Sequence, residues 1–306
     1  MRVLFARSYA TASHPGIAAA LRAFLDELKA QHGDAYAPAR AAIAVAGPVE
    51  SGVARLPNRP EWRIERSALQ ASLGIETALL NDFEALALGV AQGSSADWLE
   101  LQPGNAVPQA NIALVGAGTG LGVSALFWDG QQYRPLATEA GHMAFAPHDE
   151  LQAELWRHLL ARHGRVSTER VVSGRGISAI YEFLRLRDAG AAAAPLKDPA
   201  RIAAQALSDP AGTAGRALDL FIACYGAFAG DIALAFLARG GLYLCGGIAA
   251  KLAERFTKGD FMAAFGAKGR HGTLAASIPV RLVRNEDLGL LGAAYAATNR
   301  RATNFS

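Results

Sequence analysis

The sequence predicts an α/β fold in two lobes, a smaller N-terminal α/β lobe and a larger α+β lobe. At 306 residues the chain is longer than a typical single domain, and hydrophobic residues make up 51% of it, enough to fill a sizeable core. Strand-like and helix-like runs alternate along the first third. The polar stretch 93–109, which contains glycine and proline, is typical of a lobe boundary. We therefore assign residues 1–92 and 286–306 to the smaller lobe and 93–285 to the larger.

In the smaller lobe, residues 2–9 are expected to form a strand and 14–30 an amphipathic helix. The apolar run 41–46 reads as a buried strand that ends in a Gly-Pro turn. Residues 75–80 predict another strand, which leads through a polar turn into a helix beginning near Glu84.

In the larger lobe, residues 111–128 predict a hairpin, and a second turn at Asp129-Gly130 predicts another antiparallel strand. The alanine-rich stretch 189–194 is expected to be a loop. Later segments are expected to be helices at 149–163, 176–187, 199–208 and 214–238, a strand-turn-helix unit at 241–248, a strand at 278–283 and a closing helix at 289–298.

Charge and composition exclude several classes of protein. The net charge is +3, and no basic run is longer than Arg300-Arg301. The sequence therefore lacks the clustered basic residues that are typical of a nucleic-acid-binding protein. The apolar segment 217–238 contains two aspartates and predicts a buried helix rather than a membrane span. The N-terminal apolar stretch is too short for a signal peptide. Cys224 and Cys245 lie in apolar runs, as reduced core thiols of a cytoplasmic protein would.

The most informative motif is the glycine-rich turn of the predicted hairpin. Gly116, Gly118, Thr119 and Gly120 lie between two apolar runs, where backbone N–H groups can close on a phosphate. Leu121 occupies the place of the third glycine of a dinucleotide fingerprint, and no P-loop Gly-Lys-Ser/Thr follows. The turn is therefore either a phosphate-binding hairpin or a tight β-turn with no ligand.

Three polar groups are further candidates. Asn81 and Asp82 follow a predicted strand, at the edge where open α/β sheets bind ligands, although either could simply cap the next helix. Glu139 and His142 share a glycine-containing loop; they could be ordinary surface or core residues, and no third side chain at metal-like spacing accompanies them. Glu169 alone is most often a solvated charge or a helix-cap residue.

Taken in order, six segments resemble the bacterial glucokinases, hexokinase-type sugar kinases of the actin-like ATPase and ribonuclease H-like superfamily. Each segment is a weak signal by itself, but their order and spacing span nearly the whole chain. They are Leu79–Ala85, Gly116–Gly122, Glu139–His142 with Phe145–Pro147, Glu169–Gly174, Cys245–Ile248 and Gly289–Ala293.

The resemblance implies ATP-dependent phosphorylation of glucose to glucose 6-phosphate, the first step of glycolysis, with Mg²⁺ accompanying ATP. It implies that Asp82 is the general base for the 6-hydroxyl, and that Asn81, Glu139, His142 and Glu169 hydrogen-bond the other hydroxyls. Carboxylates, amides and imidazoles suit a hexose, whose hydroxyls both donate and accept.

The resemblance also implies how the nucleotide is held. Phosphoryl transfer requires mainly positioning and charge neutralisation. The implied nucleotide-binding residues are Gly116, Gly118, Thr119 and Gly120 on the phosphates, with Gly246 and Gly247 beside the adenosine. No metal ligand is assigned. A homodimer formed through the larger lobe is expected.

The chain departs from the family at its start. The family begins with a strand and a first phosphate hairpin, Asp-x-Gly-Gly-Thr-x-x-Arg, whose aspartate helps place magnesium, and this motif does not occur here. We expect an N-terminally truncated smaller lobe. The start is then assigned too far downstream, the chain is a truncated paralogue with impaired catalysis, or another segment substitutes.

Other functions stay open at this point. A sugar-binding or regulatory protein of the same fold would keep the sugar residues without turning over ATP. The related ROK kinases carry a cysteine-rich zinc motif near the sugar-binding histidine, and no cysteine lies near His142. A dehydrogenase is disfavoured because no dinucleotide fingerprint occurs in a strand-turn-helix context. The hexose preferred and the true phosphoryl donor are not determined by these residues.

Overall fold

The computed structural model describes residues 3–56, 59–189 and 195–299. Their contacts divide the chain into two compact units, one comprising residues 1–92 and 287–306 and the other residues 93–286. Each unit has its own buried apolar core. The alanine-rich stretch predicted as a loop falls on residues 190–194, which lie outside the described residues, apart from Ala189, the last residue of a helix.

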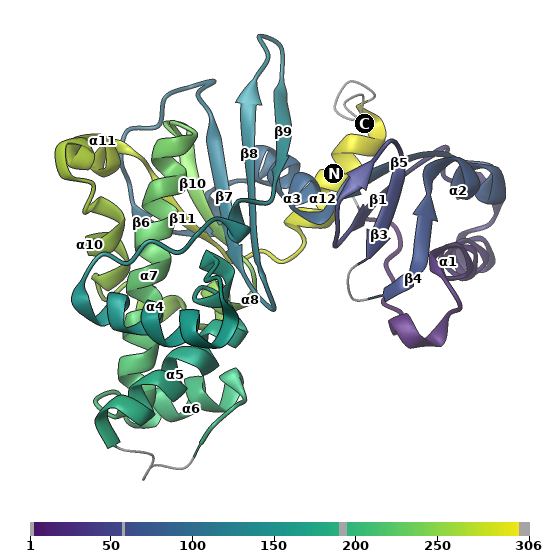
Figure 1. Cartoon of the computed structure of the whole chain (residues 1–306). Coiled ribbons are helices and arrows are strands. Elements are labelled where there is room, and N and C mark those ends of the chain that lie inside the picture. Colours follow the sequence, from purple (N-terminus) through teal and green to yellow (C-terminus); the bar gives the residue numbers. More distant parts are fainter. Residues whose placement is uncertain (1–2, 57–58, 190–194, 300–306) are drawn as a thin grey trace. The chain divides into compact units, whose positions relative to one another are not determined.

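The smaller unit contains a parallel strand pair and a separate antiparallel sheet (Figure 1). The parallel pair is in register from Arg40 opposite Glu76 to Val45 opposite Asn81. Buried Ile43, Val45 and Leu79 belong to the core of this unit. Its elements are η1 (Thr11–Ser13), α1 (Ile17–His32), η2 (Asp34–Tyr36), β1 (Arg40–Val45), β2 (Val49–Glu50), β3 (Val53–Leu56), β4 (Arg59–Glu65), α2 (Arg66–Leu73), β5 (Glu76–Asn81), α3 (Asp82–Gln92) and α12 (Leu288–Thr298).

The predicted strand at residues 2–9 is wrong for the part that is described. Residues 3–10 form no strand, and among the described residues β1 pairs with β5 alone. These residues instead place aromatic side chains on α1: the Phe5 ring lies 5.1 Å from that of Phe24, and the Tyr9 hydroxyl donates to Glu27 at 2.9 Å. A short apolar run forms a strand only where a partner strand supplies hydrogen bonds.

Helices α3 and α12 pack unusually closely because glycines face each other at the contact. A Cβ on Gly89 would lie 1.8 Å from the carbonyl oxygen of Leu288, and a Cβ on Gly292 would lie 1.7 Å from that of Ala85. Any larger residue at either position would therefore force the two helix axes apart.

The larger unit is built on a six-stranded mixed sheet in the order β6-β11-β10-β7-β8-β9. The central strands β7 and β10 are parallel, with Cys245 opposite Gly116, and β8 pairs antiparallel with β7. The strands are β6 (Trp98–Gln102), β7 (Ile112–Ala117), β8 (Leu121–Trp128), β9 (Tyr133–Thr138), β10 (Gly241–Cys245) and β11 (Val280–Val283).

Helix α7 is the central helix of this unit and contacts β7, α5, α6 and α10 (Figure 1). It is long and apolar enough to cross a membrane. However, 78% of its most apolar 18-residue segment is buried inside the fold, as in the core helix of a folded domain. The helices are η3 (Ser95–Asp97), η4 (Ala140–His142), α4 (Glu150–His163), η5 (Thr168–Arg170), α5 (Gly174–Ala189), α6 (Pro199–Ser208), α7 (Thr213–Ala235), α8 (Gly247–Lys251), α9 (Ala253–Phe256), α10 (Asp260–Gly266), η6 (Gly269–His271) and α11 (Gly272–Ser277).

The buried Tyr225 of α7 fixes the end of β7. Its hydroxyl donates to the carbonyl of Val115 at 3.0 Å and accepts the N–H of Ala117 at 3.2 Å. Strand β10 ends opposite Gly116, so the tyrosine hydroxyl supplies hydrogen bonds at the point where the strand pairing stops. The backbone entering the glycine turn is therefore anchored from the core.

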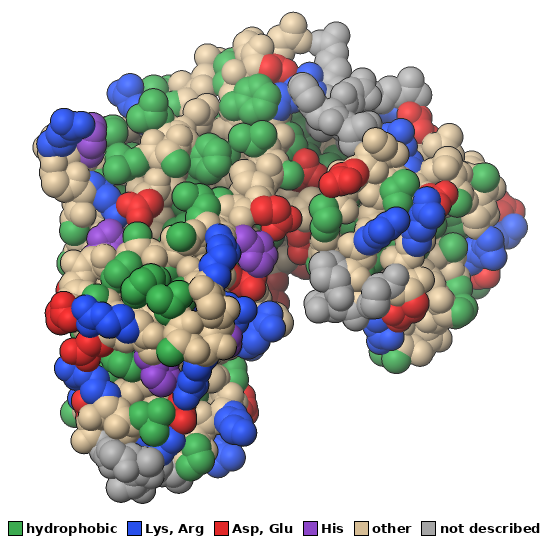
Figure 2. All heavy atoms as spheres, viewed as in Figure 1, with side chains coloured by type: hydrophobic (Ala, Val, Ile, Leu, Met, Phe, Trp, Pro, Cys, Tyr) green, Lys and Arg blue, Asp and Glu red, His purple; other side chains and the backbone are tan. Residues whose placement is uncertain are grey.

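The other predicted strands and helices are confirmed, with shifts of a few residues at their ends. Within the stretch 93–109, which the sequence predicts as a lobe boundary, residues 98–102 form edge strand β6, which pairs with β11 and which the sequence analysis did not predict. On the face of the molecule in view in Figure 2, basic and acidic side chains are interspersed.

The α3–α12 contact gives a matched pair of substitutions. Gly292→Ala should lower the free energy of unfolding by about 1–3 kcal/mol, because its methyl group would overlap a backbone carbonyl. Gly289→Ala, on the same helix with nothing within 4 Å of its Cβ, should be neutral or stabilising by up to about 1 kcal/mol. Urea denaturation of both variants measures the difference, and equal stabilities would contradict the close packing.

Candidate functional site

Two glycine turns meet at one edge of the large sheet. Strands β7 and β10 run parallel, so the 118–120 turn after β7 and the Gly246–Gly247 turn after β10 emerge side by side. The turn closes through a hydrogen bond from the Gly118 N–H to the Gly120 carbonyl at 2.8 Å, and the Gly118 carbonyl accepts from the Gly174 N–H at 2.8 Å. This second bond ties the turn to the start of α5.

The backbone conformation at Gly246 strongly favours glycine. Its φ is +86°, and a Cβ there would lie 2.6 Å from the carbonyl oxygen of Ala117. Gly247 has open space around it. The first glycine thus lets β10 and β7 approach at their ends, while the second leaves the start of α8 uncovered.

Beside these turns lies an apolar cavity of about 400 Å³. The first turns of α5 and α6 contribute to its wall, and helix N-termini favour negatively charged groups. Of the nucleotide residues predicted from the sequence, Gly118, Thr119 and Gly247 line this cavity; Gly116, Gly120 and Gly246 do not line it. The lining residues are Gly118, Thr119, Gly174, Arg175, Ile177, Pro199, Ala200, Ala203, Gly247, Ile248, Lys251 and Leu252.

A second cavity in the same unit, of about 370 Å³, is polar. His142 and Glu169 from the sequence prediction both line it. Glu139 does not line it, but its carboxylate lies 4.0 Å from Nε2 of His142, and its side chain is 75% exposed. The lining residues are His142, His163, Arg165, Ser167, Glu169, Arg170, Ser173, Arg175 and Ala179.

Backbone pairing brings His142 and Glu169 together although 26 residues separate them in sequence. Met143 accepts the Thr168 N–H at 2.8 Å, and the Phe145 N–H donates to Val166 at 3.0 Å. The guanidinium of Arg165 also donates to the His142 carbonyl at 2.7 Å. The segments before η5 and after η4 therefore form one short, bonded wall.

Glu169 connects this polar cavity to the glycine turn. One of its carboxylate oxygens, Oε2, accepts the N–H of Leu121 at 3.2 Å, immediately after the turn. A Cβ on Gly120 would lie 2.6 Å from the same oxygen. A side chain at position 120 would therefore displace the Glu169 carboxylate from its place beside the turn.

Asn81 and Asp82 lie in the smaller unit, at the junction of β5 and α3. The Asn81 side chain caps α3: its Oδ1 accepts the Phe83 N–H at 2.8 Å, and its amide donates to the Gly47 carbonyl at 3.0 Å. The Asp82 side chain also accepts the Phe83 N–H, at 2.9 Å, and the residue is solvent-exposed. Even so, desolvation by nearby protein atoms raises the pKa of Asp82, and the Phe83 hydrogen bond opposes that rise.

The described residues include no group of three histidine, cysteine, aspartate or glutamate side chains that could hold a metal ion. Mg²⁺ bound to a nucleotide takes most of its ligands from phosphates and water and needs only one or two carboxylates. Magnesium that arrives with a nucleotide would therefore not require such a group of side chains.

Sequence reasoning missed the basic residues of the two cavities. Arg165, Arg170 and Arg175 line the polar cavity, and Arg175 and Lys251 line the apolar one. Single exposed arginines beside glycine turns carry no periodic signal, and only the folded chain brings them to a common surface.

Comparison with known proteins identifies the family. The family model for glucokinase matches residues 2–300. The chain belongs to the glucokinase family. It is 41% identical over 281 residues to a glucokinase of a Nostoc species, an alignment that covers 85% of this chain and 82% of the relative. A glucokinase of Neisseria meningitidis is 37% identical, with 92% of this chain and 83% of the relative covered.

The solved structures agree with this assignment. The crystal structure of a glucokinase from an Antarctic psychrotroph superposes with a TM-score of 0.84 at 31% identity, covering 95% of this chain and 88% of that one. A ROK family glucokinase from Streptomyces griseus, solved with glucose and AMPPNP, shares the fold alone, with a TM-score of 0.64 at 18% identity over 92% of this chain and 87% of that one. The chain thus has the actin-like ATPase fold of the glucokinase and ROK kinases.

The two neighbouring glycines of the β10 turn provide a test of the local geometry. Gly246→Ala should lower the free energy of unfolding by about 1–3 kcal/mol, because it combines a positive φ with overlap on a backbone oxygen. Gly247→Ala should leave stability nearly unchanged, since its Cβ meets nothing within 4 Å. Thermal unfolding compares the two; a tolerated Gly246→Ala would show that the turn is less constrained than described.

Proposed function

We propose that this member of the glucokinase family transfers the terminal phosphoryl group of ATP to the 6-hydroxyl of glucose. The observation that carries the proposal is that the glycine turn lines one cavity of the larger unit and that Leu121, which follows the turn, is hydrogen-bonded to Glu169, which lines a second cavity. One cavity is apolar and lined by helix starts; the other is polar and contains His142 and Glu169. A nucleotide suits the first and a hexose the second.

In this proposal the polar side chains orient the sugar. Glu169 accepts from sugar hydroxyls with the lone pairs that the Leu121 N–H leaves free, and His142 and Glu139 supply an imidazole and a second carboxylate. Asn81, already fixed as a helix cap, offers its remaining amide hydrogen. These roles rest on side-chain chemistry and on the family motifs.

Asp82 is proposed as the general base. Its carboxylate takes the proton of the 6-hydroxyl as the bond from that oxygen to the γ-phosphorus forms and the bond from the γ-phosphorus to the β-bridging oxygen breaks, which releases ADP. The Gly118 N–H is already bonded to the Gly120 carbonyl, so the other backbone N–H groups of the turn and the Thr119 hydroxyl hold the phosphates. Mg²⁺ bound to ATP neutralises phosphate charge.

We also propose that the chain works in the cytoplasm, early in glycolysis, as a homodimer. Both cysteines are buried free thiols, as expected in a reducing compartment. Size-exclusion chromatography with light scattering reads the oligomeric state directly.

Glucose binding tests the polar cavity. Glu169→Gln keeps the shape of the side chain and removes its charge, so glucose affinity should fall by about 1–3 kcal/mol, the cost of impairing hydrogen bonds to a charged group. Glu139→Gln should have an effect in the same range. Glu150→Gln, at an exposed position on α4, is the matched control. Calorimetry measures all three, and unchanged affinity in both site variants would remove these residues from the sugar site.

Turnover tests Asp82 and the function together. In a coupled assay for glucose 6-phosphate, Asp82→Asn should reduce kcat by roughly 10²- to 10⁴-fold with little change in glucose affinity. If the unsubstituted chain binds glucose but forms no product, it is a sugar-binding protein rather than a kinase. If the variant keeps most of its turnover, Asp82 is only part of the helix start.

The raised pKa of Asp82 sets the direction of two further readouts. Because the protonated carboxyl cannot act as a base, kcat/KM should fall as the pH drops through a pKa higher than that of an ordinary aspartate. The fold disfavours the ionised form, so this group lowers stability as the pH rises through the raised pKa. Asp82→Asn should therefore lose turnover at pH 7 without a lower Tm.

A further inference from the structure

Arg175 occupies a place that no motif predicted. Among the described residues it alone lines both the apolar cavity beside the glycine turn and the polar cavity of His142 and Glu169. The proposed phosphoryl transfer must cross from one cavity to the other. A residue shared by both walls therefore lies where the transferred group passes.

The side chain of Arg175 is free to reach a ligand. It is 77% exposed, and its guanidinium lies 4.0 Å from Oε1 of Glu169, too far for a direct hydrogen bond. Glu169 is held through its other oxygen by the Leu121 N–H. The arginine is thus kept near the turn by a fixed carboxylate, in a weak pair that a stronger anion can replace.

Its position in the helix also favours an anionic partner. Arg175 is in the first turn of the 16-residue helix α5, where the helix dipole disfavours a positive charge. The cationic side chain and the first turn of the helix both favour a phosphate that lies between them. A neutral hexose would need neither.

We propose that the guanidinium of Arg175 binds the transferred phosphoryl group, first as the γ-phosphate of ATP and then as the 6-phosphate of the sugar product. This proposal rests on the proposed function. During transfer, Arg175 donates hydrogen bonds to non-bridging oxygens; it exchanges no proton and forms no covalent bond. Its positive charge offsets charge on the phosphoryl oxygens while the sugar oxygen replaces the β-bridging oxygen on phosphorus.

Calorimetry with two ligands tests the proposal without requiring turnover. Arg175→Ala should weaken the binding of glucose 6-phosphate by about 10- to 100-fold and change glucose binding by less than about twofold. Arg175→Lys should fall between, since lysine keeps the charge but loses the two-pronged geometry. In the coupled assay, Arg175→Ala should lower kcat more than it raises the glucose KM.

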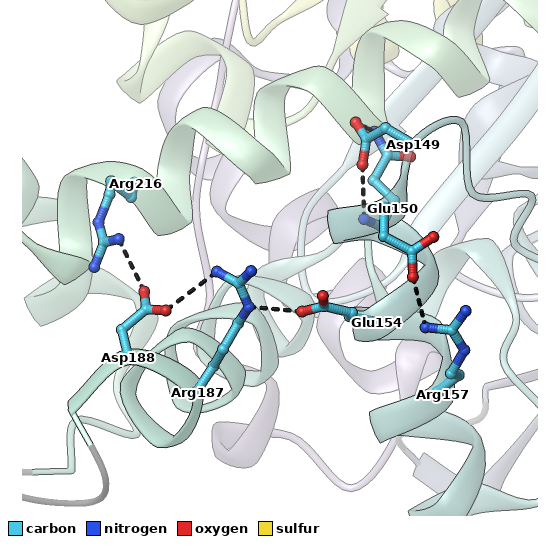
Figure 3. Close-up of polar contacts among 8 residues, drawn as sticks. Asp149, Glu150, Glu154, Arg157, Arg187, Asp188 and Arg216 are labelled. Carbon is cyan, nitrogen blue, oxygen red and sulfur yellow. Dashed lines mark hydrogen bonds and ion pairs between the residues drawn. The ribbon is translucent and has the colours of Figure 1, made fainter.

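The matched control is Arg187→Ala, on the same helix. Arg187 forms ion pairs with Glu154 at 2.6 Å and with Asp188 at 3.1 Å (Figure 3). It lines neither cavity. The Arg187→Ala variant should therefore bind both ligands as the unsubstituted chain does. Lys251→Ala, which changes only the apolar cavity, should raise the KM for ATP and leave glucose 6-phosphate binding within about twofold.

The outcomes separate this inference from the proposed function. If the unsubstituted chain forms product and Arg175→Ala binds glucose 6-phosphate normally, the role of Arg175 is wrong and the kinase function stands. An equal loss of glucose and glucose 6-phosphate binding would make Arg175 a structural residue and would also overturn the proposal. If the unsubstituted chain does not bind glucose 6-phosphate, the proposed role of Arg175 in binding the product is wrong.

Discussion

The parallel pairing of β7 with β10 is the interaction on which the candidate site depends. With Cys245 opposite Gly116, both strands end at the same level, so two turns far apart in sequence become neighbours. A slip of one residue would invert which side chains face the core on either side of the sheet. The glycines at the two turns permit the close approach, and Tyr225 fixes the end of β7 from within α7. The strand register thus determines the chemistry at the edge.

Near that edge, the larger unit has two cavities with chemically different walls. Helix starts and apolar side chains form one wall, and η4, η5 and their paired flanking segments form the other. Glu169 is bonded to the Leu121 N–H that follows the turn, and Arg175 lines both cavities with its exposed guanidinium near Glu169. Because Glu169 and Arg175 both border this junction, single substitutions there are informative about ligand binding.

The sequence predicts helices and strands well where capping and turn residues mark their ends. It predicts them poorly where a strand depends on a partner strand that is distant in the sequence. Asp198 and Pro199 mark the start of α6, and Asp198 does accept the Ala200 N–H at 2.9 Å. The strand predicted over residues 2–9 is wrong for the described part because a short apolar run resembles a strand whether or not a partner strand exists. Strands β2 to β4 and β6 are short or carry polar residues, so their periodicity was too weak to detect. Among candidate site residues, motif order indicated His142 and Glu169, but no local pattern indicates that Arg175 borders two cavities.

The burial of the two thiols has a consequence for following this protein in solution. Cys224 and Cys245 are 1% and 0% exposed, and burial raises the pKa of both thiols, so neither reacts in the folded chain. A thiol reagent can modify them only when the larger unit opens, and under suitable conditions the labelling rate therefore reports the free energy of that opening. Cys245 directly precedes the Gly246 turn. Any ligand that binds beside that turn and stabilises the closed unit would slow the labelling of Cys245. The labelling rate of this buried thiol would therefore report ligand binding.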